Sequence, residues 1–187
     1  MQTNKTNPNL VRRCFLGMIG ASFLPLIKSA SAVPFLSKTL RSDRALSFYN
    51  THTGESLKRC VFWANGRFDP QALRSINRLF RDHRNNKSIP IDPNLILFLH
   101  NLSKTMGTDK PFHLISGYRS PETNALLRLR THGVASKSQH TIGRAADIFV
   151  EGRSLKQIQK AALSLMAGGV GRYDSFVHVD TGKIRSW

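Results

Sequence analysis

The chain has 187 residues, with 28 lysines and arginines against 11 acidic residues, and a formal net charge of +17 at pH 7. Its length suits one domain with a hydrophobic core of its own, and its two cysteines exclude a disulfide-rich scaffold. In the cytoplasm so basic a protein would suggest a nucleic-acid partner, so the compartment has to be inferred first.

The N-terminal segment predicts a secretory signal. Arg12 and Arg13 precede an apolar run that extends to Ile27, and small residues follow it up to Ala32. The paired arginines followed by Phe-Leu favour the twin-arginine (Tat) route. The apolar run is shorter than the about 20 residues that a membrane-spanning helix needs. We therefore expect a Tat-type signal over residues 1–32, export to the periplasm, and no stable membrane insertion after cleavage.

Cleavage would leave residues 33–187 as a single domain. The lost segment contains four basic residues and no acidic one, so the formal charge falls from +17 to +13. Cys60 would then be the one remaining cysteine, which excludes an intramolecular disulfide. Outside the cytoplasm the available polyanions are the cell wall, with its free carboxylates, and the membrane surface. The alternative is a solvated basic face that aids non-specific adhesion.

The first half of the mature chain predicts a β-hairpin followed by two helices. Residues 46–50 and 57–63 are typical of strands, and Gly54 in the segment between them suits a turn. Asp-Pro pairs at 69–70 and 92–93 each provide an N-cap and a proline for the first helical turn. The helices that they open extend to about residues 82 and 104, with apolar side chains at helical spacing: Leu73, Ile76, Leu79 and Phe80, then Leu95, Ile96, Leu99 and Leu102.

The second half mixes short strands with helices and does not follow a regular βαβ alternation. We expect strands over residues 112–118, 145–150 and 176–180, with helices that begin after Ser120 and after Ser154. The last helix is expected to end at Gly168-Gly169. This order predicts an α+β fold: one domain with a small antiparallel sheet flanked by helices.

Four residues of this half are candidates for a metal site. His140 lies in a predicted loop, Asp147 on a strand, and His178 and Asp180 alternate along the last strand, so the side chains of these two leave the same face. Two histidines and one carboxylate are a common ligand set for catalytic zinc, with the fourth position left to water. Spacing alone leaves the structural alternative open, in which each residue is a hydrogen-bonded polar side chain.

Three motifs in a fixed order point to a known family. They are SGYRSP at residues 116–121, Ser-x-His-x-x-Gly-x-Ala-x-Asp at residues 138–147, and FVHVD at residues 176–180. Together they resemble the zinc peptidases that include D-Ala-D-Ala carboxypeptidases, D-Ala-D-Ala dipeptidases and L-alanyl-D-glutamate endopeptidases. Within this group the chain most resembles the MepK-type murein endopeptidases (YcbK-like proteins), and the resemblance covers nearly all of the mature chain.

The resemblance implies a cleft with one zinc ion per chain, held by His140, Asp147 and His178. It also implies hydrolysis of peptidoglycan stem-peptide cross-links, with MepK-type proteins indicating those between meso-diaminopimelate residues, and no nucleic-acid partner. Two alternatives stay open. One is a D,D-carboxypeptidase that trims the terminal D-Ala, and the other is a non-catalytic wall-binding module.

The resemblance also suggests catalytic residues, with one departure. Relatives place a Glu or Asp general base three residues before the last His ligand, where this chain has Ser175. Asp180 is our first candidate for the base, with an orienting role toward a ligand histidine as its alternative, and Asp174 is the second. Arg119 resembles the family's cleft arginine, which would polarise the scissile carbonyl or bind a substrate carboxylate. Ser138 is expected to contact substrate or to orient the ligand loop.

Overall fold

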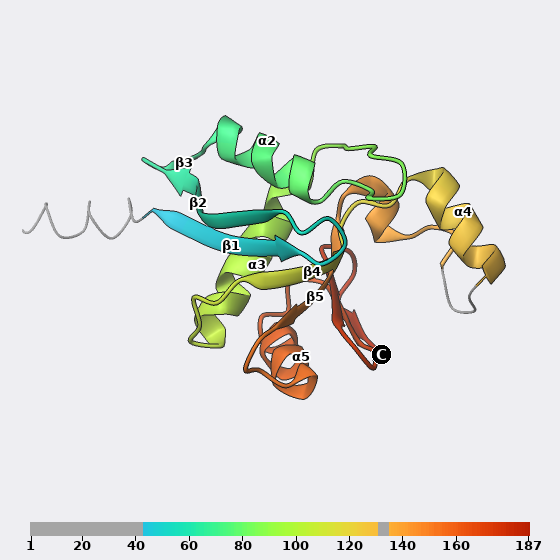
Figure 1. Ribbon diagram of the computed structural model, residues 1–187. Helices are drawn as coiled ribbons and strands as arrows, with labels where there is room; N and C mark the ends of the chain where they lie inside the picture. Colours follow the sequence, from blue (N-terminus) through green and yellow to red (C-terminus); the bar gives the residue numbers. More distant parts are fainter. Residues whose placement is uncertain (1–42, 131–134) are drawn as a thin grey trace, which may run out of the picture.

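The computed structural model describes residues 43–130 and 135–187, so the expected signal segment lies outside it. In this part of the chain no helix has the length and apolar character that crossing a membrane requires. The elements in chain order are β1 (Arg44–Asn50), β2 (Ser56–Ala64), β3 (Arg67–Phe68), α2 (Pro70–Leu79), α3 (Pro93–Thr105), β4 (Phe112–Ser116), α4 (Pro121–Arg130), the 3-10 helix η1 (Gln139–Ile142), β5 (Ala145–Val150), α5 (Leu155–Ser164), β6 (Gly169–Arg172), β7 (Val177–Asp180) and β8 (Arg185–Ser186) (Figure 1).

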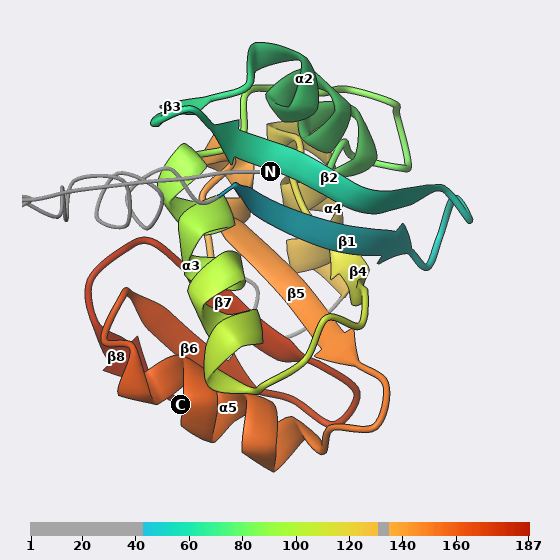
Figure 2. The same ribbon diagram turned by 90° about the vertical axis from the view of Figure 1, so that its left-hand side faces the viewer.

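The strands form one mixed sheet in the order β3-β2-β1-β4-β5-β7-β6-β8. Most neighbouring strands are antiparallel, but β1 runs parallel to β4 and β6 runs parallel to β8. Figure 2 shows α3 crossing one face of the sheet, with α5 beside the C-terminal strands. The predicted α+β class is therefore confirmed, whereas the predicted antiparallel character of the sheet is wrong at these two pairings.

The predicted helix starts are confirmed by their caps. The Asp69 carboxylate accepts a hydrogen bond from the Ala72 amide at 2.7 Å, and the Asp92 carboxylate accepts one from the Asn94 amide at 2.9 Å. At α5, Ser154 forms a capping box with the residue three positions later. These contacts satisfy amides that a helix start otherwise leaves without a partner, so local sequence suffices to place the three helices.

The segments that the sequence did not predict are short strands. The last helix ends at Ser164, before the expected Gly168-Gly169, and Gly169 instead begins β6. β3 and β8 have two residues each and lie at the two edges of the sheet. Strands of this length carry too little periodicity to be recognised, and β8 proves important for the site described below.

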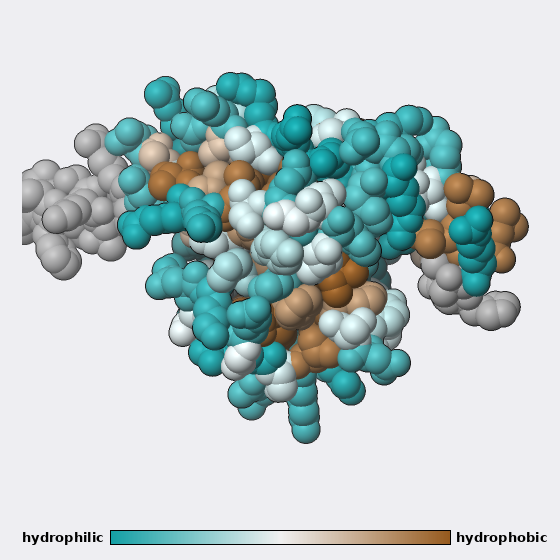
Figure 3. Space-filling model, in the orientation of Figure 1, coloured by the Kyte–Doolittle hydropathy of each residue, from teal (hydrophilic) through white to brown (hydrophobic). Residues whose placement is uncertain are grey.

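One helix stands apart from the body of the fold. α4 projects from the rest of the chain in Figure 1, and its Leu126 and Leu129 are exposed. Figure 3 shows a hydrophobic patch on this helix, where the surrounding surface is mostly hydrophilic. By contrast, α2, α3 and α5 contribute side chains to the hydrophobic core.

The central strands β5 and β7 separate an apolar face from a polar one. Ile148 on β5 and Val177 and Val179 on β7 belong to the hydrophobic core and are fully buried. Because side chains alternate along a strand, Asp147 and His178 lie on the opposite face, as the sequence pattern predicts. The core therefore fixes the two strands that carry these polar side chains.

Candidate metal site

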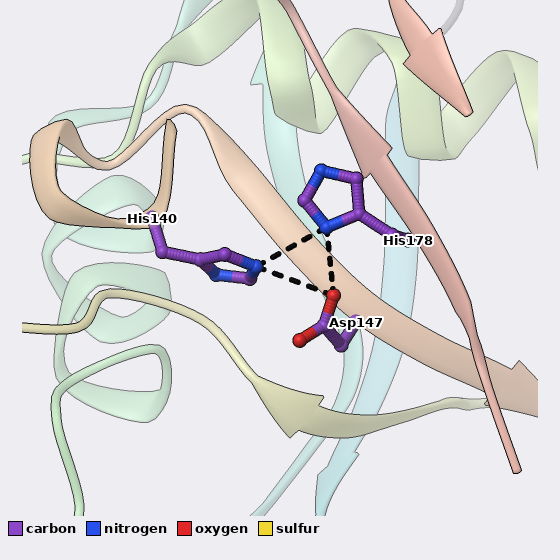
Figure 4. Close-up of side chains that lie close together, drawn as sticks. All are labelled: His140, Asp147 and His178. Carbon is purple, nitrogen blue, oxygen red and sulfur yellow. Dashed lines mark hydrogen bonds and ion pairs between the residues drawn. The ribbon is translucent and has the colours of Figure 1, made fainter. Parts of the chain in front are cut away.

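The predicted metal ligands come together on the polar face of the sheet. Asp147 on β5 and His178 on β7 are direct partners across the antiparallel pair, and His140 reaches them from η1 (Figure 4). Nδ1 of His178 lies 2.8 Å from Oδ1 of Asp147, and Nε2 of His140 lies 3.2 Å from both of these atoms. In the described part of the chain, these residues form the group of potential ligands that could share one metal ion.

Hydrogen bonds on the outer side of each ring fix which nitrogen faces the cluster. Nδ1 of His140 donates to the carbonyl oxygen of Gly117 at 2.6 Å, and Nε2 of His178 donates to Oδ2 of Asp180 at 2.9 Å. A carbonyl or a carboxylate can only accept, so these nitrogens carry the protons. His140 Nε2 and His178 Nδ1 face Asp147, and their lone pairs would be available to a bound metal ion. Burial lowers the pKa of His178, but without a metal its hydrogen bonds to Asp147 and Asp180 raise the pKa to about 8.

This arrangement suits a divalent ion. Ligand atoms held at about 2.0–2.2 Å from a tetrahedral zinc lie roughly 3.3 Å from one another. The three separations in the cluster are 2.8, 3.2 and 3.2 Å. Metal-bound histidines commonly donate their second ring N–H to a carbonyl or carboxylate, as both rings do here. The residues present therefore fit the metal that the sequence suggests.

Local sequence positions His140 in η1. The Ser138 hydroxyl accepts a hydrogen bond from the His140 amide at 3.3 Å and caps the short helix. Gly143 ends the helix with a φ of 69°, and a Cβ at this position would lie 2.7 Å from the Pro90 carbonyl oxygen. Only glycine combines this backbone conformation with so close a neighbour. The polar and small residues around His140 thus form the turn that presents the ring.

Asp180 is completely buried beside the cluster. Besides the bond from His178, its carboxylate accepts hydrogen bonds from the amides of Gly169 and Gly182 at 3.2 and 2.8 Å. The Arg185 guanidinium approaches both carboxylate oxygens, at 2.6 and 3.1 Å. Burial raises the pKa of Asp180, but the hydrogen bonds from His178 and Arg185 outweigh burial and hold the pKa well below its usual range.

The charge of Asp147 is balanced by its surroundings. Burial raises the pKa of this carboxyl, and the neighbouring His140 and His178 lower it further than burial raises it, so the pKa lies below its ordinary value. Nη2 of Arg119 lies 3.7 Å from Oδ2, the oxygen that faces away from the two histidines. An ionised aspartate at this depth requires such partners, because an unpaired buried carboxylate is costly.

Arg119 borders the cluster from the segment that follows β4. Burial lowers the pKa of its guanidinium and Asp147 raises it, with a net decrease. Nε of Arg119 is buried without a hydrogen-bond partner among the described residues, and Nη1 and Nη2 make long contacts of 3.5 Å with Asn124 and Ser116. The guanidinium therefore retains donor capacity beside the candidate ligands.

Asp82 stabilises the turn that carries Arg119 through hydrogen bonds to backbone amides. This buried carboxylate accepts hydrogen bonds from the amides of Ser120 at 3.0 Å and Arg84 at 3.1 Å. The Arg119 amide in turn donates to the His140 carbonyl oxygen at 3.2 Å. The segment around Arg119 and η1 are thus connected through the backbone.

Asp174, the second candidate for the general base, and Ser175, at the position of the family's base, are not part of the buried cluster. Both are exposed in the turn between β6 and β7. Sequence reasoning missed the Gly117 carbonyl and the side chains of Arg185 and Trp187, whose indole centroid lies 5.4 Å from that of the His178 ring. These contacts depend on the order of the strands, which the sequence did not predict.

Comparison with known proteins decides the family. The family model described as peptidoglycan L,D-endopeptidase MepK matches residues 38–187. This chain belongs to the MepK family. It is 46% identical over 171 residues to the peptidoglycan L,D-endopeptidase MepK of Escherichia coli K12, covering 90% of each chain, and 46% identical over the same length to that of Shigella flexneri. It is 40% identical over 147 residues to the probable MepK of Haemophilus influenzae, which covers 77% of this chain and 78% of the relative.

Membership of the MepK family confirms the resemblance drawn from the three sequence motifs, and with it the prediction of a peptidase. The match spans every described element, from β1 to β8. It includes His140, Asp147 and His178 and also the terminal segment with Arg185 and Trp187.

Proposed function

We propose that this protein is an exported zinc endopeptidase that hydrolyses peptide cross-links of peptidoglycan. Its family and its MepK relatives, named as peptidoglycan L,D-endopeptidases, support the reaction and the substrate. The observation that carries the proposal is the convergence of His140 Nε2, His178 Nδ1 and Asp147 Oδ1 on one point. Such a ligand set would hold a Lewis acid, which can polarise an amide carbonyl and activate water at neutral pH.

Zinc is the metal that the ligands favour. Two imidazole nitrogens and one carboxylate suit zinc better than magnesium or calcium, which prefer all-oxygen surroundings. When bound, the ion would supply Lewis acidity toward a peptide carbonyl and toward water. His140, Asp147 and His178 would hold it, and the Gly117 carbonyl and Asp180 would keep the two rings in the required tautomers.

Arg119 is proposed to bind substrate. Its guanidinium lies beside Asp147 and has an unused buried donor, Nε. Peptidoglycan stem peptides contain free carboxylates, and a guanidinium binds a carboxylate through paired hydrogen bonds. The same group could polarise the scissile carbonyl, so substitution of Arg119 should reduce both binding and turnover. Ser138, which caps η1, is proposed to support the ligand loop that presents His140.

Between the two roles considered for Asp180, we favour orientation of His178 over proton transfer to substrate. The carboxylate is sealed from solvent and all its bonds go to His178, Arg185 and two backbone amides. Asp174 is exposed on the β6–β7 turn and remains the alternative candidate for the general base.

Export is proposed on two grounds. The N-terminal sequence has the features of a Tat signal, and the substrate named for the relatives, peptidoglycan, lies outside the cytoplasm. The basic character of the chain fits an acidic cell-wall polymer.

The proposal is tested with purified protein 33–187 and defined muropeptides. We expect conversion of cross-linked dimers to monomers, loss of this activity with a chelator, and recovery on adding zinc. The mass of the product separates the alternatives, because loss of a single alanine identifies a D,D-carboxypeptidase. If dimers stay intact with zinc present while the protein still binds sacculi, the wall-binding alternative is correct and the peptidase proposal is wrong.

A further inference from the structure

We propose that Trp187 is a specificity-determining residue that forms an apolar wall of the substrate site beside His178. The inference rests on the proposed peptidase function and names a contact for its substrate. The indole takes the aliphatic part of a stem-peptide residue next to the cleaved bond. Its place is set by the edge strand β8 and by two glycines of β6.

The register of the last strands aligns residues of β8 and β7 across β6. On the polar face, Asp180 of β7 lies opposite Gly169 of β6, which lies opposite Arg185 of β8. Two residues along β6, Gly171 lies opposite His178. Trp187 directly follows β8, and its amide donates to the carbonyl of Val170 while its carbonyl accepts from the amide of Arg172. Two rows of neighbouring residues therefore run across these strands. One is Arg185, Gly169 and Asp180, and the other is Trp187, Gly171 and His178.

The two glycines of β6 leave space that neighbouring side chains fill. A Cβ at Gly169 would lie 2.5 Å from Nη1 of Arg185, and a Cβ at Gly171 would lie 2.5 Å from Nε1 of Trp187. Separations below about 3.0 Å are not found for real Cβ atoms. Any larger residue on this face of β6 would therefore displace the side chains of β8. Because β6 has glycines and no side chains on this face, the side chain of Arg185 reaches Asp180 and that of Trp187 reaches His178.

Trp187 is held in place by its neighbours and is nevertheless about half exposed. Its Nε1 donates to the Tyr173 hydroxyl at 2.9 Å, and the Arg185 guanidinium lies 5.0 Å from its ring centroid. The residue nevertheless keeps 47% of its surface exposed. An aromatic side chain that is held in place and partly exposed beside the candidate ligands is suited to binding an aliphatic group, because little side-chain entropy is lost when the ligand binds.

The surroundings of the cluster are charged on one side and aromatic on the other. Arg119 borders the cluster on the side of Asp147, whereas Trp187 borders it on the side of His178. A stem-peptide residue offers both an aliphatic portion and a carboxylate. A substrate whose carboxylate faces Arg119 would place an apolar portion toward the indole, so the two residues together would select the orientation of the peptide across the metal site.

The experiment uses the fact that the chain has two tryptophans, Trp63 and Trp187. Trp63 lies on β2, where it packs against Phe68 on the far edge of the sheet. In a Trp63→Phe background, Trp187 alone reports fluorescence. Titration of the zinc-loaded protein 33–187 with a soluble cross-linked muropeptide dimer should change the emission saturably. The same titration of a Trp63→Phe, Trp187→Phe variant controls for changes in tyrosine fluorescence.

Kinetics and metal content complete the test. Trp187→Ala should raise KM for the dimer about tenfold, with kcat changed less than about threefold, since an apolar wall contributes to ground-state and transition-state binding alike. Gly171→Ala, which displaces the indole without removing it, should raise KM in the same direction. Met166→Ala removes an exposed apolar side chain at the end of α5 and is the control. Zinc content and the circular dichroism spectrum should match those of the unchanged protein.

The outcomes separate this inference from the proposed function. An unchanged KM in Trp187→Ala overturns the inference, and so does a loss of bound zinc that accounts for the lost activity, because Trp187 would then only support His178. If the unchanged protein cleaves no dimer, the peptidase proposal fails and the fluorescence titration decides: a saturable change supports the contact with stem peptides, and a flat titration overturns it.

Discussion

The Asp180 carboxylate accepts a hydrogen bond from Nε2 of His178 at 2.9 Å, while Nδ1 of the same ring lies 2.8 Å from Asp147. One side of the ring is thus reserved for a buried acceptor and the other for the cluster. The tautomer of His178 is decided by a residue that shares its strand and lies two positions further along the chain. The role of Asp180 can be tested directly.

Asp180→Asn should weaken zinc binding by about 10- to 100-fold, because an amide can present its NH2 group to His178 and no longer fixes the ring nitrogen. Competition with a chromophoric chelator measures the affinity. Asp174→Asn is the matched control and should bind zinc as the unchanged protein does. If Asp180→Asn binds zinc normally but has lost all turnover, Asp180 acts as the general base instead. Loss of turnover in Asp174→Asn alone would assign that role to Asp174.

Arg185→Gln should lower the free energy of unfolding by about 1–3 kcal/mol, because it removes charge-assisted hydrogen bonds from a carboxylate that stays buried. Chemical denaturation of the metal-free protein measures the change without a contribution from zinc. Lys183→Gln removes an exposed positive charge from the same segment and should leave stability within about 0.5 kcal/mol. If Arg185→Gln has the same free energy of unfolding as Lys183→Gln, Arg185 does not support Asp180.

Zinc should stabilise the folded protein through the cluster. A ligand that binds only the native state adds about 2.7 kcal/mol to stability at a free concentration one hundred times its Kd. Thermal unfolding should therefore shift upward on adding zinc to the chelated protein. Asp147→Asn and His140→Ala should abolish the shift, and His113→Ala, a histidine on β4 outside the cluster, should preserve it. A shift that persists in Asp147→Asn would place zinc elsewhere.

Gly117→Ala should impair both folding and metal binding. A Cβ at Gly117 would lie 2.6 Å from the Phe80 carbonyl oxygen, so the backbone must move and carry away the carbonyl that accepts from His140. We expect a loss of about 1–3 kcal/mol in stability, typical of overpacking, and weaker zinc binding. Gly107→Ala is a control for glycine substitution, since its Cβ meets open space, although its positive φ gives it a small cost of its own. Unchanged zinc affinity in Gly117→Ala would contradict the proposed role of its carbonyl.

Asp82 should make stability depend on pH. Burial raises its pKa, but hydrogen bonds from Thr123 and from the amides of Ser120 and Arg84 lower it further, so the folded pKa lies below the ordinary value of about 3.9. The ionised form therefore stabilises the fold above about pH 4, and this contribution is lost as the pH falls through the folded pKa. Asp82→Asn should be less stable at pH 7 by about 1–3 kcal/mol. Its stability should also fall less between about pH 5 and pH 3 than that of the unchanged protein. Parallel pH profiles would contradict this assignment.

Much of the fold follows from local sequence signals. Asp69, Asp92 and Ser154 cap helices where predicted, and the hairpin turns at the predicted segment with Gly54 at a φ of 71°. These features depend on residues within a few positions of one another. The parallel pairing of β1 with β4 joins segments more than fifty residues apart, and no local pattern encodes it.

The candidate site likewise has residues that the sequence predicts and residues that depend on long-range strand pairing. Alternation along residues 176–180 correctly places His178 and Asp180 on one face, and the family motif gives the three residues that converge. Arg185 and Trp187 were missed because their contacts cross a strand that the sequence did not reveal. The available signal was the Gly-x-Gly pattern of β6, where a strand interior lacks side chains on one face and another part of the chain comes close.

The attachment of Asp147 and His178 to the apolar core separates the chemistry from the choice of substrate. Their strands cannot shift without disturbing Ile148, Val177 and Val179, so the core holds these two candidate ligands in position. The two groups proposed to touch the peptide lie outside these strands, Arg119 in the turn after β4 and Trp187 directly after the edge strand β8. Changes at these two positions could alter which bond is cut while the hydrolytic centre stays intact.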